Sequence, residues 1–206
     1  MPRPRLHDLD ELMDAAEKLA VESGPASVTV RALSQVTGAS NGAIYHAFGS
    51  RSGLLGQVCL RAAQRFLDLQ RAAVDQEANP IDAVVAAADS PAEFSIAFGT
   101  SGRFLLTVDR AELLGSREMP TDVATQLQAL EGTLTELFIR LAQAMWGRGD
   151  REAVAVIRDC VVELPTALLL RRDRTPDAAA RARLAAAVRA ILALEPPAPQ
   201  PRNPNR

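Results

Sequence analysis

The sequence has few of the residues that build metal, redox or covalent catalytic sites. Its 206 residues include two cysteines and two histidines, and no spacing among them matches a disulfide framework or a set of zinc ligands. We therefore expect no metal and no cofactor. Cys59 and Cys160 stand far apart, and lone cysteines in helical runs are more often small buried side chains than redox sensors. A redox role for either thiol is the alternative.

Long apolar runs and an excess of basic residues are also missing. No stretch of about 18 apolar residues occurs, so we expect no membrane span. The first residues carry acids early and lack the apolar run of a signal peptide, so we expect a cytoplasmic protein. The formal net charge is −2, which does not indicate a strongly basic nucleic-acid binder.

Aromatic residues are scarce, with six Phe, one Trp and one Tyr, whereas 48% of the residues are apolar and alanine, leucine and valine dominate. Alanine and leucine are strong helix formers, so the composition predicts an all-α fold of about nine helices. Apolar spacing and breakers place these helices at 8–23, 30–36, 41–48, 51–76, 80–88, 91–106, 121–146, 151–172 and 176–194. The stretch 107–117 is expected to be a loop with one helical turn, and the proline-rich stretch 195–206 a disordered tail.

Short polar residues predict where several helices begin. Asp8, followed by Glu11 three residues later, is expected to cap the first helix. Thr29, Ser40 and Ser50 are expected to cap the next three helices in the same way.

Prolines predict further boundaries. Ser90 with Pro91 is expected to separate two helices, and Pro176 to lie in the first turn of the last helix, where a missing N–H costs nothing. Pro165 lies inside an apolar helix, which it should kink or split. The helix at 30–36 is expected to bury one side, formed by Val30, Leu33 and Val36.

Two short helices joined by the turn 37–39 predict a helix-turn-helix unit, with Gly38 adopting the left-handed conformation. Such a unit places its second helix in the major groove of DNA, while the first crosses the backbone. Here the second helix opens with four small residues, Ser40, Asn41, Gly42 and Ala43. Glycine inside a helix costs about 1 kcal/mol relative to alanine, and close approach to DNA would explain it at this position.

This region resembles the TetR family of bacterial regulators. The matching residues are Thr29, Val30, Arg31, Ala32, Leu33, Val36, Thr37, Gly38, Ala39, Ser40, Ala43, Ile44, Tyr45, His46, Ala47, Phe48, Ser50, Arg51, Leu54 and Leu55. The resemblance implies a three-helix DNA-binding domain at 1–53 and a helical effector-binding and dimerisation domain at 54–194. The body resembles the family only in length and helicity.

The resemblance also implies a DNA-binding set. This set is Thr29, Arg31, Ser40, Asn41, Gly42, Ala43, Tyr45, His46 and Arg51. The four residues from Ser40 fall where family members approach base edges, and an asparagine such as Asn41 can pair with adenine through two hydrogen bonds. Tyr45 and His46 fall at contacts to phosphate or nearby bases, and a surface histidine is the alternative for His46.

The charges of the first 55 residues give mixed evidence on DNA binding. Arg51 lies in the first turn of a helix, where the macrodipole makes a cation unfavourable, and a bound DNA phosphate would reverse that energy. Residues 1–55 nevertheless carry five Lys and Arg against six Asp and Glu, and all six acids lie on the first helix. We therefore expect few phosphate contacts and a modest salt dependence of binding. Arg3 and Arg5 form an arm that either reaches a minor groove or is solvated.

The last two long helices carry apolar stripes that suit a homodimer. The stripe residues are Val156, Cys160, Leu164 and Leu168 on one helix, and Leu184, Val188 and Ile191 on the other. The resemblance implies that these helices pair across a two-fold axis, which would set two recognition helices about 34–36 Å apart on a pseudo-palindromic operator. Phe98, Phe104 and Phe138 are candidates for lining a cavity for a small hydrophobic effector, or else are ordinary core residues.

These expectations describe a ligand-responsive transcriptional repressor that binds double-stranded DNA and is not an enzyme. In the mechanism that the resemblance implies, the effector shifts the long helix that begins near Arg51 and so changes the spacing of the two DNA-binding heads. A small helical enzyme is one rival, but no paired carboxylates, nucleophile constellation or phosphate loop supports it. A helical adaptor that binds protein through the same surface is the other.

Overall fold

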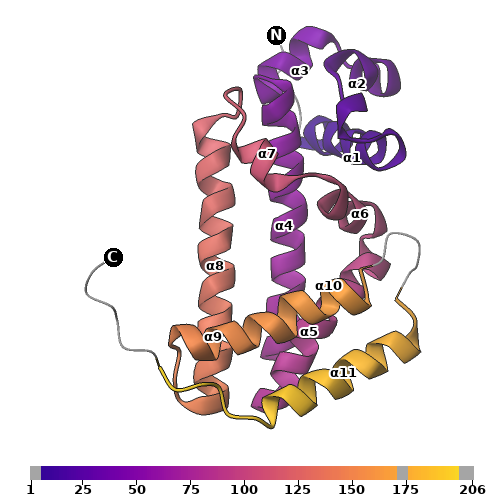
Figure 1. Cartoon of the computed structure of the whole chain (residues 1–206). Coiled ribbons are helices and arrows are strands. Elements are labelled where there is room, and N and C mark those ends of the chain that lie inside the picture. The colour runs from indigo at the N-terminus through magenta and orange to yellow at the C-terminus, as the bar shows by residue number, and fades with distance from the viewer. Residues whose placement is uncertain (1–5, 171–175, 200–206) are drawn as a thin grey trace. The chain divides into compact units, whose positions relative to one another are not determined.

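The computed structural model describes residues 6–170 and 176–199, which contain helices and no strand, as the sequence predicts (Figure 1). These residues form two compact units, one of Arg65 and the chain before it together with Phe98–Glu131, the other of Phe66–Ala97 together with the chain after Glu131. The long helices α4 (Arg51–Asp75) and α8 (Thr121–Trp146) each contribute residues to both units. Within the described residues, no helix is both long and apolar enough to cross a lipid bilayer.

The first unit begins with α1 (Leu6–Ser23), the short turn η1 (Pro25–Ser27), α2 (Val30–Thr37) and α3 (Asn41–Phe48), which precede the start of α4 (Figure 1). Thr29 Oγ1 accepts a hydrogen bond from the amide of Ala32, and Ser40 Oγ from that of Ala43, both at 3.1 Å, so these two caps are confirmed. The predicted cap at Asp8 is wrong, because α1 begins two residues earlier.

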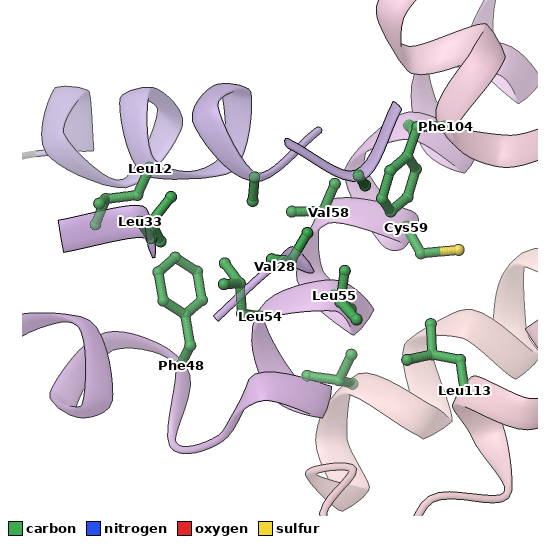
Figure 2. Packing of buried hydrophobic residues seen from close by; sticks show 14 of the residues in the cluster. Leu12, Val28, Leu33, Phe48, Leu54, Leu55, Val58, Cys59, Phe104 and Leu113 are labelled. Atoms are coloured by element: carbon green, nitrogen blue, oxygen red, sulfur yellow. The ribbon is translucent and has the colours of Figure 1, made fainter. Parts of the chain in front are cut away.

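The core of this unit joins α1, α2 and α3 to the start of α4 and to α6 (Gly99–Thr107) (Figure 2). Leu33 and Phe104 are fully buried in it. The prediction that Val36 is also buried is wrong, since 61% of this residue is exposed. The single helical turn expected within 107–117 is α7, Arg110–Leu114.

The second unit contains α5 (Pro80–Ala97), which continues through Pro91, so the predicted break at Ser90 and Pro91 is wrong. A proline in a helix leaves the carbonyl four residues earlier without its usual donor. Here that carbonyl belongs to Ala87, and Gln70 Nε2 of α4 donates to it at 3.0 Å from a fully buried position. A side chain distant in sequence therefore replaces the missing backbone donor, and the helix does not end.

The predicted helix at 151–172 contains a change of winding just before Pro165. It consists of α9 (Arg151–Arg158), the π-helical turn η2 (Asp159–Glu163) and α10 (Leu164–Leu168), and the last predicted residues lie outside the described residues. The amide of Leu164 donates to the carbonyl of Asp159, five residues back. Proline cannot donate in this ladder, and a π-turn is one of the ways a helix accommodates the gap. The predicted irregularity at Pro165 is thus confirmed.

The last helix is α11 (Ala178–Leu192), and its cap is Asp177, whose carboxylate accepts a hydrogen bond from the amide of Ala180 at 2.7 Å. The prediction that Pro176 lies in the first turn is therefore wrong. Arg181 of α11 forms ion pairs with Asp89 and Glu93 of α5, which holds the two helices together.

The predicted disorder of 195–206 stays a prediction, and the structure describes residues 195–199 of this stretch as a non-helical segment. Pro196 is buried, and Arg148 Nη2 donates to the carbonyl of Pro197 at 2.9 Å. Arg148 also pairs with Asp150, the cap of α9, so one arginine links this segment to the turn between α8 and α9. Residues 200–206 and the predicted arm at Arg3 and Arg5 lie outside the described residues.

Candidate DNA-binding site

The helix α3 presents its first turn to solvent. Ser40, Asn41, Gly42 and Ala43 are all exposed, whereas Ile44 and Phe48 on the opposite side are buried in the core. A Cβ placed on Gly42 would have no neighbouring atom within 4 Å. The first turn therefore offers a surface of small side chains around the helix N-terminus, where the free backbone N–H groups favour anions such as phosphate.

Four other predicted contact residues lie on exposed parts of α2 and α3. Tyr45 is 56% exposed and His46 is exposed on α3, and Thr29 and Arg31 are exposed at the start of α2. Gly38, between the two helices, has φ of 74°, as its predicted left-handed conformation requires. The helix-turn-helix geometry expected from the sequence is therefore present, and these side chains are available to a partner.

Arg51 differs from the other predicted contact residues because its guanidinium is engaged within the protein. Nε donates to the carbonyl of Val28 at 2.8 Å, and Nη2 donates to the carbonyl of Pro25. These acceptors offset the unfavourable position of a cation in the first helical turn. A DNA phosphate is thus not needed to explain why this helix begins with arginine.

The first turns of α4 are tightly packed, and sequence reasoning missed this feature. A Cβ on Gly53 would lie 2.1 Å from the carbonyl oxygen of Phe48, and one on Gly56 would lie 2.8 Å from both Met119 Sδ and Val123 Cγ1. Only glycine permits so close an approach. The spacing of the two glycines, three residues apart and hence on one face of the helix, was the available signal.

Serine side chains reinforce the same contact. Ser50 Oγ donates to the carbonyl of Glu118 at 2.7 Å and accepts from the amide of Gly53 at 2.9 Å, so its predicted role as a cap is confirmed. Ser52 and Ser116 are hydrogen-bonded through their hydroxyls at 2.8 Å. The start of α4 is therefore held by residues 116–123 as well as by the helices that precede it.

The acids of α1 are paired with one arginine of α4. Arg61 forms ion pairs with Asp10, Asp14 and Glu17, at distances from 2.6 to 3.1 Å. Burial of the guanidinium lowers the pKa of Arg61, but its contacts with Glu17 and Asp14 outweigh this effect, so that the pKa lies above its ordinary value. Glu17 is itself buried and accepts a hydrogen bond from Ser101 Oγ of α6 at 2.9 Å. Three of the six acids on α1 are thus paired with one arginine, which offsets one of their three negative charges.

The three phenylalanines predicted to line an effector cavity have different surroundings. Phe104 is fully buried in the core of the first unit, where Figure 2 shows it beside Cys59. Phe98, in the same unit, is 39% exposed, and the guanidinium carbon of Arg65 lies 5.8 Å from its ring centroid. Phe138 is buried in the second unit. The role of these three residues in binding an effector stays a prediction.

A groove of about 540 Å³ lies in the second unit, between α5, α11 and the end of α4. Its lining includes the carboxylates of Glu77, Asp82, Asp89 and Glu93, together with Arg181 and Arg189, and several alanines. None of the predicted aromatic residues lines it. Arg181 and Arg189 are already paired with carboxylates of α5.

The predicted dimer stripes lie partly inside the second unit. Cys160, Leu184 and Val188 are at most 1% exposed, so they cannot contact a second chain without rearrangement. Val156, Leu164 and Ile191 are half-buried, and Leu168 is 40% exposed. Burial and the neighbouring charge of Asp159 raise the pKa of the Cys160 thiol to about 11, and Cys59 is buried too.

Comparison with known proteins gives a match of the N-terminal region to one family model and a similar fold in solved structures. Residues 12–58 match the family model of bacterial regulatory proteins, tetR family. No curated protein matches the sequence. This family consists of DNA-binding regulators and not of enzymes.

Solved structures with a similar fold include three named regulators. The TetR family transcriptional regulator PfmR from Thermus thermophilus is 20% identical, with a TM-score of 0.67 over 88% of this chain and 97% of that one. The ketosteroid transcriptional regulator KstR2 of Mycobacterium tuberculosis is 18% identical, with a TM-score of 0.64 over 90% and 93%. The fatty acid degradation regulator FadR from Bacillus halodurans is 15% identical, with a TM-score of 0.64 over 89% and 96%.

Proposed function

We propose that this TetR-family transcriptional regulator is a ligand-responsive repressor that binds a pseudo-palindromic operator as a homodimer. The observation that carries the proposal is the exposed first turn of α3, formed by Ser40, Asn41, Gly42 and Ala43 and backed by the buried Ile44. A helix whose polar, sterically small end is exposed can enter the major groove and bring base-reading groups close to the base edges.

Each half of the proposed complex combines base and phosphate contacts. Asn41 and Tyr45 face the bases or the sugar-phosphate edge, and His46 lies one turn from the start of the same helix. The exposed N-terminus of α2, with Thr29 and Arg31, faces a phosphate, which its backbone N–H groups and the cation both favour. Few cations take part, so we expect the affinity to depend only modestly on salt.

The proposed homodimer uses the exposed residues of the last two helical segments instead of the stripes that the chain buries within itself. On α11 the exposed small residues Ala182, Ala186 and Ala190 recur every four positions, which allows close approach of a second helix. Leu168 at the end of α10 adds an exposed apolar side chain. An operator with two half-sites one DNA turn apart would require the two α3 helices of the dimer to lie roughly 34–36 Å apart.

The effector in this proposal is a small apolar molecule that binds the helical body and weakens DNA binding. Support comes from the fold shared with regulators whose names refer to ketosteroids and to fatty acid degradation. The charged residues that line the groove between α5 and α11 favour a polar molecule. That groove is therefore not the site proposed for an apolar effector.

Selection of bound duplexes from a random pool tests the DNA-binding function. We expect enrichment of an inverted repeat with half-sites one helical turn apart, together with a dimer by light scattering at micromolar concentration. No enrichment would contradict DNA binding, and enrichment by a monomer would contradict the dimer. Titration of the selected complex with a ketosteroid and with a fatty acid then tests the effector, since an apolar effector must lower the affinity for DNA.

A further inference from the structure

We propose that Arg51 is a positioning residue for DNA recognition, which holds the N-terminus of α2 in place through a bridge to η1 and does not itself contact DNA phosphate. The inference rests on the proposed DNA-binding function and assigns this residue a role that its position alone did not suggest. We call the pair of hydrogen bonds from Arg51 to the carbonyls of Pro25 and Val28 the Arg51 bridge.

The geometry of the Arg51 bridge depends on the shape of guanidinium. Nε reaches the carbonyl of Val28 at 2.8 Å, while Nη2 reaches that of Pro25. The two donors belong to one rigid plane, and the two acceptors are three residues apart on one short turn. The amide of Val28 also donates to the carbonyl of Pro25, at 3.2 Å, so the arginine closes a turn that the backbone has begun. Lysine could keep the charge but could not present both donors in this plane.

The Arg51 bridge acts directly before the start of α2. Val28 is fully buried in the core of the unit, and the next residue, Thr29, is the N-cap of α2. The side chain of Arg51 therefore connects the start of α4 to the residue that precedes the exposed N-terminus of α2. That N-terminus supplies the proposed phosphate contact beside Arg31, and α2 packs against α3.

Electrostatics support the same assignment. A cation in the first turn of α4 faces the positive end of that helix dipole. The two carbonyl oxygens supply negative partial charge at that point, and the side chain is half-buried and not extended into solvent. The Arg51 bridge uses two of the five N–H donors of the guanidinium, so a phosphate contact would have to use the remaining donors or replace the carbonyl acceptors.

Two variants separate positioning from phosphate contact. Arg51→Lys keeps the charge and loses the planar pair of donors, whereas Arg51→Gln loses the charge as well. If Arg51 positions α2, both variants should weaken binding to the selected duplex by about tenfold, the order of one weakened charge-assisted hydrogen bond to phosphate. Because the α2 N-terminus is a proposed phosphate contact, binding to a random-sequence duplex should fall in both variants as well. The decisive result is that Arg51→Lys, which keeps the charge, loses as much affinity as Arg51→Gln.

A phosphate contact would give a different pattern. Arg51→Lys would then bind like wild type, and Arg51→Gln would reduce the salt slope by about one and weaken selected and random duplexes alike. Arg31→Gln is the matched control, because Arg31 is exposed on α2 and is proposed to face phosphate. It should reduce the salt slope by about one.

The outcomes also distinguish the bridge from a contribution to stability alone. Binding is measured well below the melting temperature. If the bridge only stabilises the fold, the variants would have a lower Tm and unchanged affinities for both duplexes. That result would overturn the inference. If Arg51→Gln does not fold, Arg51→Lys decides alone. If wild-type protein selects no duplex, the proposed function fails, whereas a selecting wild type with the phosphate pattern in its variants overturns the Arg51 assignment only.

Discussion

The starts of α3 and α4 lie ten residues apart and follow the same local pattern, yet their surroundings differ. Each is capped by a serine, Ser40 or Ser50, and each has a glycine in its first turn, Gly42 or Gly53. Around Gly42 a Cβ would meet nothing within 4 Å, whereas on Gly53 it would meet a backbone oxygen at 2.1 Å. The start of α3 is exposed to solvent, whereas residues 52–56 at the start of α4 are buried. The residues that pack around a helix start, and not its capping pattern, therefore decide whether it is exposed or buried.

The largest expected effect comes from adding one methyl group at each glycine. Gly53→Ala forces the methyl against the Phe48 carbonyl and should lower the free energy of unfolding by about 3 kcal/mol or more. Gly42→Ala should raise it by up to about 1 kcal/mol, because alanine is the better helix former and the space is open. Urea unfolding of the two variants measures both values. Equal effects at the two positions would remove the distinction between these helix starts.

A change of one exposed side chain on α3 should affect DNA binding and not stability. Asn41→Ala removes a proposed base contact and should weaken binding to the selected duplex by roughly 10- to 100-fold, with no change in Tm beyond a degree or so. Fluorescence anisotropy and thermal unfolding give the two numbers. Ser52→Ala, which loses the buried hydrogen bond to Ser116, is the control and should show the reverse pattern. An Asn41 variant with full affinity would remove this residue from the proposed site.

Replacing the two capping serines should lower the free energy of unfolding by amounts that differ by about one hydrogen bond. Ser40→Ala loses only the cap of α3 and should cost about 1 kcal/mol of unfolding free energy. Ser50→Ala loses a cap and also the bond to the Glu118 carbonyl, so we expect about 2 kcal/mol. Chemical unfolding of the two variants provides the comparison, and a smaller loss at Ser50 would show that residues 116–123 do not hold this helix start.

The smallest expected effect concerns Gln70 of the second unit, whose side chain replaces a missing backbone donor. Gln70→Leu leaves the Ala87 carbonyl without its donor, and this loss should matter because Pro91 cannot supply one. We expect the substitution to be about 1 kcal/mol more costly in the wild type than in a Pro91→Ala background, where a backbone N–H is restored. A double-mutant cycle on unfolding free energies measures this coupling, and a value of zero would show that Gln70 does not compensate for the proline.

Local sequence signals predicted the parts of the fold that depend on a few consecutive residues. Thr29 and Ser40 cap as expected, Gly38 turns as expected, and the exposed residues of α3 follow from its buried Ile44 and Phe48. These features depend on hydrogen bonds and apolar spacing within one or two helical turns. The pattern of the helix-turn-helix unit was therefore readable before any tertiary contact was known.

Local signals were not sufficient where the outcome depends on residues that are distant in the sequence. Pro91 does not end α5 because Gln70, distant in sequence, supplies a donor. The dimer stripe at Cys160, Leu184 and Val188 was read correctly as apolar, but periodicity cannot tell the chain's own core from an interface with a second copy. The two carbonyl acceptors of Arg51 precede it by more than 20 residues, so helix-dipole reasoning alone could not predict them, and the phosphate contact of Arg51 stays a prediction.

The proposal that the exposed start of α3 reads DNA is tested most directly by amide hydrogen exchange of the wild-type protein with and without the selected duplex. DNA should slow exchange in the peptide that covers α3 and at the start of α2. Exchange at the already buried start of α4, from Ser52 to Gly56, should not change. Slowed exchange confined to other helices, with α3 exchanging as fast as in the free protein, would contradict the claim that the exposed start of α3 reads DNA.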